Sequence, residues 1–486
     1  MTQGVLLESS TSRFSPEWVS KAIFYQIFPD RFARVDHRSG HLVFKPWGSD
    51  PAEQGFHGGN LKGIECKLDY LTEFGVNALY LNPIFSSASN HRYHTYDYFQ
   101  VDPILGGNED FRQLLVAAKQ RNIKVMLDGV FNHASRGFWA FHHILENGAQ
   151  SPYADWFHVQ DWPLNPYPKE PDEHLNYVGW WNLPALPKFN TNHPDVREYL
   201  FSVAEYWAKE GIDGWRLDVP YEINDDSFWQ EFRRRVKAIN PEIYICGEIW
   251  ESGSRWLKGD MFDATMNYPF TGAVLGWFGH KNLDLTFDKS SLDLTKNSSV
   301  DFMTRINKLT SSLSPEVLQS QFNLLDSHDT ARALTIMGED LIALKQALCF
   351  LFCFPGAPCI YYGTEIALEG RDDPDCRKSF PWTESGQYET DLRPFIKQLA
   401  VLRKTHSCFT HGEPELVVLN EHVVMLKLSI EGICQAMLIQ NRSSHTFSVW
   451  QLPGFTVEGF TKAFSINSEY QDITAKSSQL WLLNNM

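Results

Sequence analysis

Eight short apolar runs alternate with helix-like segments along most of the chain, and this rhythm constrains the fold more than any other feature. The runs are rich in β-branched and aromatic residues, as buried strands are. Amphipathic stretches such as NEDFRQLLVAAKQRN (108–122) separate them. Repeated strand–helix units predict an α/β fold with a parallel sheet, and eight strands are the number that closes a (β/α)8 TIM barrel. The runs lie at 22–28, 77–83, 123–132, 213–219, 243–250, 262–268, 321–327 and 357–363.

Two further regions break this rhythm. Residues 134–193 show no strand–helix unit and are rich in Pro, Trp and Tyr. A structureless loop of that length is rare in a compact domain, so we expect a small inserted domain after the third strand. Short alternating strands over 408–486 predict a C-terminal antiparallel β-sandwich. The barrel itself is expected over 20–133 and 194–407, after an N-terminal extension of residues 1–19.

Charge and composition exclude several kinds of partner. The formal net charge of the 486 residues is −16, and a field of that sign repels nucleic acids and anionic membranes. The most apolar stretch, residues 347–363, is too short to span a bilayer and contains two prolines. The N-terminus lacks the pattern of a signal peptide, and the cysteines show no paired metal-ligand spacing. We therefore expect a cytoplasmic protein with reduced thiols, for which a neutral substrate is compatible.

Charged and polar side chains follow the ends of several predicted strands. Any one of them, taken alone, is more often a helix cap or a structural residue. In a parallel barrel, however, the carboxyl ends of all strands meet at one mouth, where the chemistry of such barrels takes place. The convergence of acids, histidines and an arginine at this mouth predicts a catalytic site. These residues are Asp128, Asn132, His133, Arg216, Asp218, Glu248, His328 and Asp329.

The segment GWRLDVPYE (214–222) places a cation and a carboxylate two residues apart in a strand. Residues at that spacing point to the same side, so Arg216 and Asp218 should lie together. We expect the fixed charge of Arg216 to keep Asp218 ionised. Glu248 lies among apolar neighbours in ICGEIW, which should raise its pKa and retain its proton.

Five segments, taken in order, resemble the conserved segments of the α-amylase family of glycoside hydrolases. They are DGVFNH (128–133), LPKFN (186–190), GWRLDVPYE (214–222), GEIW (247–250) and FNLLDSHDT (322–330). The stretches FYQIFPDRFAR (24–34) and IYYGTEIALEGRDDPDCRKSFPW (360–382) are similar to the cyclomaltodextrinase, neopullulanase and maltogenic amylase subfamily, whose members act on small or branched α-glucans. The resemblance runs from about residue 20 to the C-terminus.

This resemblance implies a retaining mechanism and a role for each matching residue. Asp218 would be the nucleophile and Glu248 the general acid/base, the two carboxyl groups that glycoside hydrolysis requires. Asp329 would be the third acid, which grips sugar hydroxyls and stabilises the transition state. His133 and His328 would hydrogen-bond hydroxyls of the same sugar, and Tyr93 would stack on its ring.

The chain departs from the subfamily pattern in three places. Subfamily members usually carry an N-terminal β-domain, whereas only about twenty residues precede the first strand here, so a homodimer would have to use another surface. His94 stands where the subfamily usually has Asp. Pro220 and Tyr221 replace a small residue and Asn before the Glu. Tyr221 either packs under the inserted domain or lies beside the leaving-group sugars, where it would change how α-1,4 and α-1,6 linkages fit.

We expect no required cofactor and predict no metal ligands. Asn132 matches a calcium ligand of amylases, but the subfamily often lacks that site. A side chain that hydrogen-bonds a loop explains Asn132 equally well.

Three hypotheses remain for the function. The first is an α-glucan hydrolase that cleaves α-1,4 or α-1,6 bonds, or both, in maltooligosaccharides, cyclodextrins, pullulan or branched chains, with debranching included. The second is a glucanotransferase of the same fold, which no feature of the sequence separates from the first. The third is a non-catalytic amylase-like binding protein, which the retention of all three acids and the lack of a membrane helix disfavour.

Overall fold

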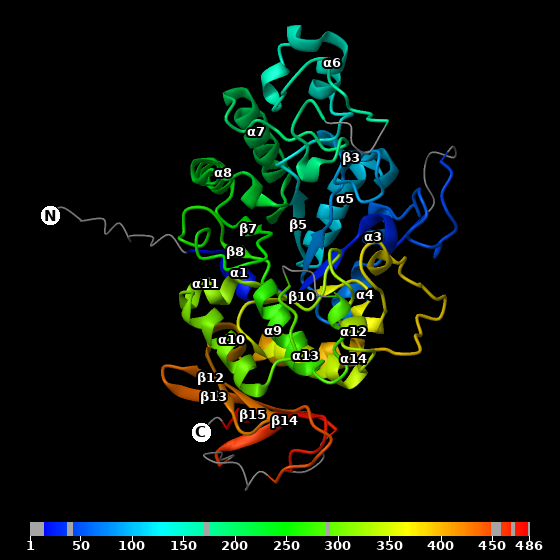
Figure 1. Ribbon diagram of the computed structural model, residues 1–486. Coiled ribbons are helices and arrows are strands. Elements are labelled where there is room, and N and C mark those ends of the chain that lie inside the picture. Colours follow the sequence, from blue (N-terminus) through cyan, green and yellow to red (C-terminus); the bar gives the residue numbers. More distant parts are fainter. Residues whose placement is uncertain are drawn as a thin grey trace, which may run out of the picture.

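The computed structural model describes residues 14–35, 42–169, 175–287, 292–448, 458–467 and 472–484. Its centre is a barrel of eight parallel strands (Figure 1). Each strand falls within one of the eight apolar runs, so the predicted TIM barrel is confirmed. The strands are β1 (Phe24–Ile27), β2 (Ala78–Leu81), β5 (Lys124–Gly129), β6 (Gly214–Leu217), β7 (Tyr244–Gly247), β8 (Ala264–Thr265), β9 (Phe322–Leu324) and β10 (Ala357–Tyr361).

The barrel closes between β8 and β9. The strand order is β8-β7-β6-β5-β2-β1-β10-β9, and Met266, directly after β8, forms a parallel bridge with Phe322 of β9. Closure leaves no unpaired sheet edge. Every barrel-strand residue except Lys124 is buried, because helices cover the outside and side chains fill the interior. This explains why the strands read as continuous apolar runs.

Helices connect most of the strands on the outside of the barrel. The connection from β7 to β8, residues 248–263, contains none. The connecting helices are α3 (Leu61–Glu65), α4 (Leu68–Glu73), α5 (Gly107–Gln120), α7 (Pro194–Glu210), α8 (Asp226–Ile239), α9 (Tyr268–Phe278), α10 (Ser299–Ser311), α11 (Pro315–Ser320), α12 (Ala333–Ile336) and α13 (Leu341–Cys353). Helix α14 (Arg393–Thr405) follows the last strand of the barrel. Shorter elements are α1 (Glu17–Ser20), α2 (Pro29–Phe32), β3 (Phe85–Ser87), β4 (Thr95–Val101), η1 (Pro103–Leu105), η5 (Pro220–Glu222), η6 (Leu285–Phe287), η7 (Thr364–Ile366) and η8 (Asp375–Arg377).

Helix α8 shows how the sequence sets these elements. The side chain of Asp225 accepts a hydrogen bond from the Ser227 N–H at 2.9 Å and caps the first turn. Phe228, Phe232 and Val236 recur at four-residue spacing and are buried on the face toward the barrel. The cap and the apolar stripe together determine where the helix begins and how it faces the sheet.

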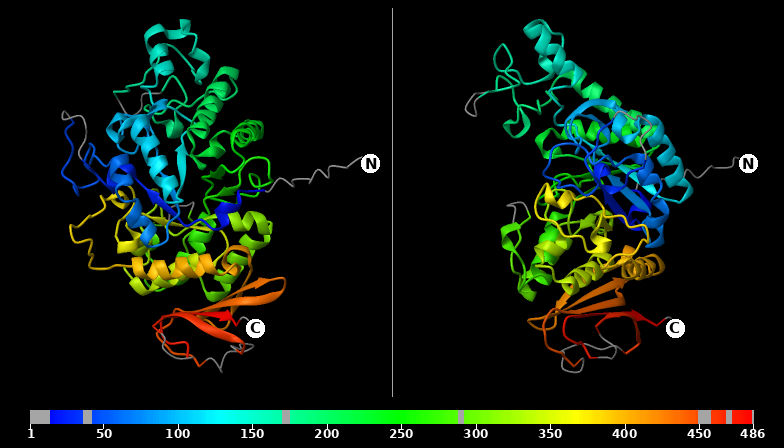
Figure 2. Two further views of the ribbon diagram at one scale, coloured as in Figure 1. Left: turned by 180° about the vertical axis from the view of Figure 1, so that it is seen from behind. Right: turned by 90° about the vertical axis from the view of Figure 1, so that its right-hand side faces the viewer.

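Residues 134–193 leave the barrel after β5 and return at α7. They contain α6 (Trp139–Asn147), η2 (Gly148–Gln150), η3 (Ala154–Trp156) and η4 (Trp180–Asn182), together with isolated β-bridges. Phe138, Phe157 and Phe189 pack their rings together within this segment. The segment lies at the opposite end of the molecule from the C-terminal sheet (Figure 2).

The C-terminal region is a five-stranded antiparallel sheet in the order β11-β12-β13-β15-β14. Leu426, Leu438 and Leu480 join the barrel core on one face. On the other face, the bridged pair Phe447 and Ile473 covers a smaller apolar cluster. Within the described residues, the expected β-sandwich thus consists of this one sheet and its small cover. The region comprises α15 (Cys408–His411), β11 (Glu413–Val418), β12 (Val423–Ile430), β13 (Ile433–Asn441), β14 (Phe460–Ile466) and β15 (Ser477–Leu483).

Membrane-spanning helices are lacking from the described ranges, where each helix is too short or too polar to cross a bilayer.

Arg403 of α14 is buried at the amino-terminal end of the barrel, far from the strand ends that carry the polar residues. Its guanidinium donates hydrogen bonds to backbone carbonyls from three separate stretches of the chain. Burial lowers the pKa of Arg403 to about 10. The acceptors are the carbonyl oxygens of Phe352 (2.9 Å), Phe354 (3.1 Å), Phe409 (2.9 Å), Ser20 (3.1 Å) and Gly356.

Replacement of Arg403 by Met should destabilise the protein without changing the polar residues at the strand ends. The substitution leaves several buried carbonyls without donors, which costs roughly 3 kcal/mol or more. We expect a lower thermal unfolding midpoint by calorimetry for Arg403→Met. The matched control Arg234→Met alters an exposed pair with Glu231 and should leave the midpoint nearly unchanged. Equal midpoints for the two variants would contradict this role.

Candidate active site

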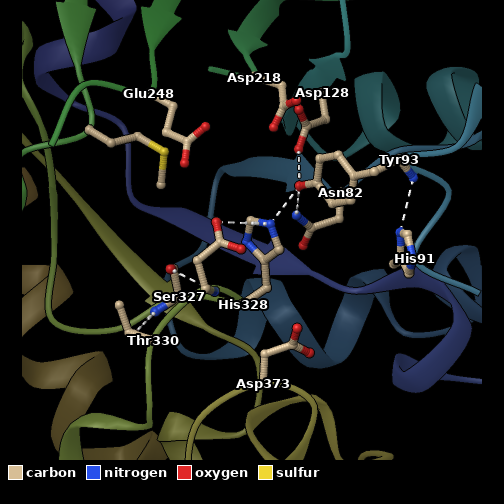
Figure 3. Close-up of polar contacts among 12 residues, drawn as sticks. Asn82, His91, Tyr93, Asp128, Asp218, Glu248, Ser327, His328, Thr330 and Asp373 are labelled. Carbon is tan, nitrogen blue, oxygen red and sulfur yellow. Dashed lines mark hydrogen bonds and ion pairs between the residues drawn. The ribbon is translucent and has the colours of Figure 1, made fainter. Parts of the chain in front are cut away.

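The polar residues at the strand ends converge at the carboxyl-terminal mouth of the barrel. Asp128 lies in β5, Asp218 follows β6 directly, and Glu248 follows β7 directly. Asp329 lies in the loop after β9. Figure 3 shows the carboxyl groups of Asp128, Asp218 and Glu248 directed into one space. Parallel strands deliver their ends to the same rim, which is why residues more than a hundred positions apart meet here.

Arg216 of β6 is the centre of this cluster. Its guanidinium is completely buried. Nη1 donates to Asp128 Oδ1 at 2.9 Å and to Asp218 Oδ1 at 3.0 Å. Nη2 lies 3.0 Å from Glu248 Oε2 and 3.7 Å from Asp329 Oδ2. One cation thus binds four carboxyl groups. The contact with Asp218 confirms the prediction from the two-residue spacing in the strand.

Opposing effects act on the pKa of Asp218 in this cluster. Burial raises the pKa of Asp218 well above its usual value, and the nearby carboxyl groups of Glu248 and Asp128 raise it further. Arg216 lowers the pKa of Asp218, as expected, but this effect is smaller than that of burial. Arg216 thus favours the ionised form of Asp218, as predicted, while desolvation and the neighbouring carboxyl groups oppose it.

Glu248 retains a proton, as expected from its apolar surroundings. Burial raises the pKa of Glu248 to about 7, and Arg216 opposes this shift. The Val219 N–H donates to Glu248 Oε2 at 2.9 Å, and Trp250 Nε1–H donates to Oε1 at 3.0 Å. Acid-assisted cleavage of a glycosidic bond requires a protonated carboxyl group beside one that can ionise.

Val219 adopts a left-handed backbone conformation, with φ 35° and ψ 51°. This region is unfavourable for a β-branched residue. Val219 follows Asp218 directly in the chain, and its conformation directs its N–H to Glu248. Such strained positions cost of order 1–3 kcal/mol and concentrate at functional sites. The strain here fixes the two carboxyl groups relative to each other.

Tyr93 and His328 form a hydrogen-bonded layer beside the carboxyl groups (Figure 3). Gln26 donates to His328 Nδ1 at 2.8 Å, so the proton of the ring is on Nε2, which lies 2.5 Å from the Tyr93 hydroxyl and 3.2 Å from Asp329 Oδ2. The Tyr93 hydroxyl in turn donates to Asp128 Oδ2 at 2.8 Å. The role expected for His328, a hydrogen bond to a sugar hydroxyl, stays a prediction. The ring is completely buried and contacts Tyr93 and Asp329, so it orients these two residues.

A cavity of about 540 Å³ opens above this cluster. Asp218, Glu248 and Asp329 lie in its wall together with Tyr93 and His133. The buried ring of His133 stacks on Trp180, and burial lowers the pKa of His133 to about 3, so the ring is neutral. His94, the residue that departs from the subfamily pattern, also lines the cavity.

Tyr221 lies in the wall of the same cavity and is 41% exposed. Its turn, η5, is tied to the inserted segment because Glu222 pairs with Lys188 at 2.7 Å. Of the two readings of Tyr221, this position supports the one that faces the cavity.

Several further residues of the cavity wall were not predicted from the sequence, among them three tryptophans and an arginine. Trp180 and Trp181 belong to the aromatic-rich stretch of the insertion, whose composition was the available signal. Trp250 follows Glu248 by two positions. Arg377 approaches Asp329, with Nη2 3.5 Å from Oδ1, from a loop that carries no strand-end signal.

In the ranges that the structure describes, no three His, Cys, Asp or Glu side chains gather as a metal site requires. The side-chain nitrogen of Asn132 lies 3.2 Å from His133 Nδ1. The buried side-chain oxygen of Asn132 has no hydrogen-bond partner within the described ranges, and both readings of Asn132 stay predictions.

The chain is similar to known proteins along nearly its whole length. The family model described as "Alpha amylase, catalytic domain" matches residues 26–480. A cyclomaltodextrinase from Geobacillus thermopakistaniensis is 41% identical over 440 residues, which are 90% of this chain and 71% of the relative. An intracellular maltogenic amylase from Bacillus subtilis is 43% identical over 84% of this chain and 66% of the relative. The solved structure of a debranching enzyme from Nostoc punctiforme has a TM-score of 0.86 and 41% identity, and the match covers 96% of this chain and 99% of that one.

The buried proton of Glu248 should make folding stability depend on pH. The pKa of Glu248 is raised in the folded protein, so its contribution is favourable below the usual pKa near 4.5 and is lost as pH rises toward 7. Glu248→Gln mimics the protonated form. We expect its thermal midpoint to match the wild type at pH 5 and to exceed it at pH 8, by of order 1–3 kcal/mol in stability. The exposed control Glu146→Gln should show no such dependence on pH, and a Glu248→Gln midpoint below the wild type at pH 8 would disprove the assignment.

Proposed function

The chain belongs to the α-amylase family of glycoside hydrolases, and from this premise we propose that it hydrolyses short and branched α-glucans with retention of configuration at C1. The proposed substrates include α-1,6 linkages as well as α-1,4 linkages. The observation that carries the proposal is the arrangement at Arg216, which holds Asp218 and Glu248 on the two nitrogens of one guanidinium.

In the first step, an Asp218 oxygen forms a bond to C1 of the sugar as the bond from C1 to the leaving oxygen breaks. Oδ1 of Asp218 is hydrogen-bonded to Arg216, while Oδ2 has no hydrogen-bond partner within the described ranges and is the oxygen we assign to the attack. When Glu248 is protonated, it competes less for the charge of Arg216. The reactive state is therefore an ionised Asp218 beside a protonated Glu248.

Glu248 delivers its proton to the leaving oxygen in this step. In the second step, water attacks C1, the bond from C1 to Asp218 breaks, and Glu248 takes the proton of the water. The same carboxyl group thus serves as acid and then as base, which fits a pKa near the operating pH. These steps use side chains and water only, so no cofactor is assigned to them.

The remaining residues hold the sugar whose C1 reacts. Asp329 lies in the cavity wall between Arg216 and Arg377, and we assign its carboxylate to the sugar hydroxyl groups, where its charge supports a cationic transition state. Tyr93 supplies a flat face in the same wall, and His133 supplies a neutral ring. His328 supports this set through Tyr93 and Asp329.

Two observations support action on branched substrates. The debranching enzyme from Nostoc punctiforme matches this chain from end to end, which makes a similar substrate class the natural proposal. Tyr221 stands in the cavity wall on the turn after Asp218. We assign it to the sugars on the leaving side, where an aromatic ring discriminates between linkages. The relative named "Intracellular maltogenic amylase" supports the further proposal of an intracellular protein.

Product analysis on pullulan and on a branched maltooligosaccharide tests the function. Maltotriose from pullulan reports α-1,6 cleavage and panose reports α-1,4 cleavage, and we expect both, with the α-configuration retained in the first product. Asp218→Asn should lose at least about a thousand-fold in kcat, because the nucleophile is lost. Tyr221→Ala should change the ratio of the two products, whereas Tyr167→Ala, an exposed tyrosine of the insertion outside the cavity wall, should not. Transfer products without free reducing sugar would indicate a glucanotransferase and would contradict the proposal.

The rate should fall as pH rises through about 7, because only protonated Glu248 can act as the acid. The hydrogen bond from Trp250 favours the ionised form of Glu248 and lowers its pKa. Trp250→Phe removes this donor but keeps a ring against Tyr268. In Trp250→Phe, we expect the fall of kcat/KM on the alkaline side of its pH profile to occur at higher pH. Trp18→Phe, which removes a hydrogen bond to the Glu242 carbonyl at the other end of the barrel, should leave this fall at the same pH. An unchanged pH profile in Trp250→Phe would contradict the assignment of Glu248.

A further inference from the structure

Trp181 is the most exposed of the large apolar residues in the cavity wall, with 75% of its surface open to solvent. Exposure of an indole ring costs free energy, because the apolar area stays in contact with water. Isolated exposed apolar residues need no explanation. Trp181 differs because it stands at the rim of the cavity that contains Asp218 and Glu248.

The backbone at Trp181 is also unfavourable. Trp181 has φ 50° and ψ 28°, and Asn182 has φ 57°. Glycine adopts this left-handed region without penalty, whereas a bulky residue such as Trp is a genuine outlier there. An exposed ring on a strained backbone is doubly unfavourable for folding. An observed outlier of this kind supports a hypothesis of function.

Ring stacking nevertheless holds the side chain of Trp181 in place. Its ring stacks on Trp180 with centroids 4.6 Å apart and planes 12° apart. Trp180 stacks in turn on His133 at 5.1 Å and 12°. This column of three rings starts at the buried His133, beside the end of β5, and ends at the exposed face of Trp181. The barrel thus supports Trp181 through packed rings.

The turn beneath the column is also tight. The Asn182 N–H donates to the Gly179 carbonyl at 2.9 Å, and the Trp180 N–H donates to the Leu186 carbonyl at 2.9 Å. A Cβ at Gly179 would lie 2.4 Å from the Leu183 carbonyl oxygen, so the turn requires glycine there. These contacts hold the indole of Trp181 in one place before any ligand arrives, which reduces the entropy lost on binding.

We infer that the exposed face of Trp181 is an outer sugar-binding subsite, which stacks on a glucosyl ring at least one unit away from the sugar that reacts. A pyranose ring has an apolar face of C–H groups that matches the flat indole in size and polarity. The cavity below holds the reacting sugar between the three acids. Trp181 therefore selects for chains long enough to reach the rim. This inference rests on the proposed function, because it assumes an α-glucan in the cavity.

Kinetics on a short and a long substrate test the subsite. Trp181→Ala should raise KM for maltoheptaose by about ten-fold, as the loss of one aromatic contact of about 1.4 kcal/mol requires, and should leave kcat/KM for an aryl α-glucoside within about two-fold. Trp139→Ala is the matched control, because Trp139 is 43% exposed in the same insertion but lies outside the cavity wall. An unchanged KM for maltoheptaose in Trp181→Ala would overturn the inference.

Thermal unfolding separates this role from a structural one. Trp181→Gly removes the ring and relieves the left-handed backbone, so we expect its unfolding midpoint to exceed that of Trp181→Ala. Both variants should lose the same affinity for the long substrate. If the affinity instead followed the midpoint, Trp181 would act through stability and the subsite would be disproved.

Binding to an inactive background separates failure of the inference from failure of the proposed function. Calorimetry with maltoheptaose should detect binding to Asp218→Asn and about ten-fold weaker binding to the double variant Asp218→Asn/Trp181→Ala. Equal binding by the two proteins would disprove the subsite and leave the proposed function standing. No binding to Asp218→Asn, together with no hydrolysis by the wild type, would reject both.

Discussion

The buried guanidinium of Arg216 is the interaction on which the rest of the site depends. A desolvated cation is tolerated only when carboxylates surround it, and four carboxyl groups at one mouth are tolerated only when a cation lies among them. The acids come from β5, from the ends of β6 and β7, and from the loop after β9. Arg216 therefore links distant parts of the chain at the carboxyl end of the barrel and holds the two central acids on adjacent nitrogens.

The same arrangement keeps a proton at neutral pH. Arg216 is shared among more negative charges than it can balance, and burial penalises each of them, so Glu248 keeps its proton up to about pH 7. The left-handed Val219 adds backbone strain at the same place. The opposite end of the barrel offsets these costs, because Arg403 satisfies carbonyls of several segments there. The stabilising contacts of Arg403 and the carboxyl cluster around Arg216 thus lie at opposite ends of the barrel.

The inserted segment contributes the wall of the cavity and none of the reacting groups. It is connected to the barrel mouth by the ring contact between His133 and Trp180 and by the ion pair between Lys188 and Glu222. Trp181 and Tyr221 both stand in the wall of the cavity. In the proposed mechanism, the strand ends carry the reacting groups and the loops above them contact the rest of the substrate. This division allows specificity to change without disturbing the acids.

The sequence by itself determined the eight strands, the position of the insertion and the acids Asp218, Glu248 and Asp329, because hydrophobic periodicity and strand-end position are local properties of a chain. Tertiary structure alone decided the raised pKa of Asp218, the buried position of His328 and the exposed face of Trp181. Each of these depends on distances between residues far apart in the chain. Burial and electrostatic coupling are set by the whole packed environment, which no short segment contains.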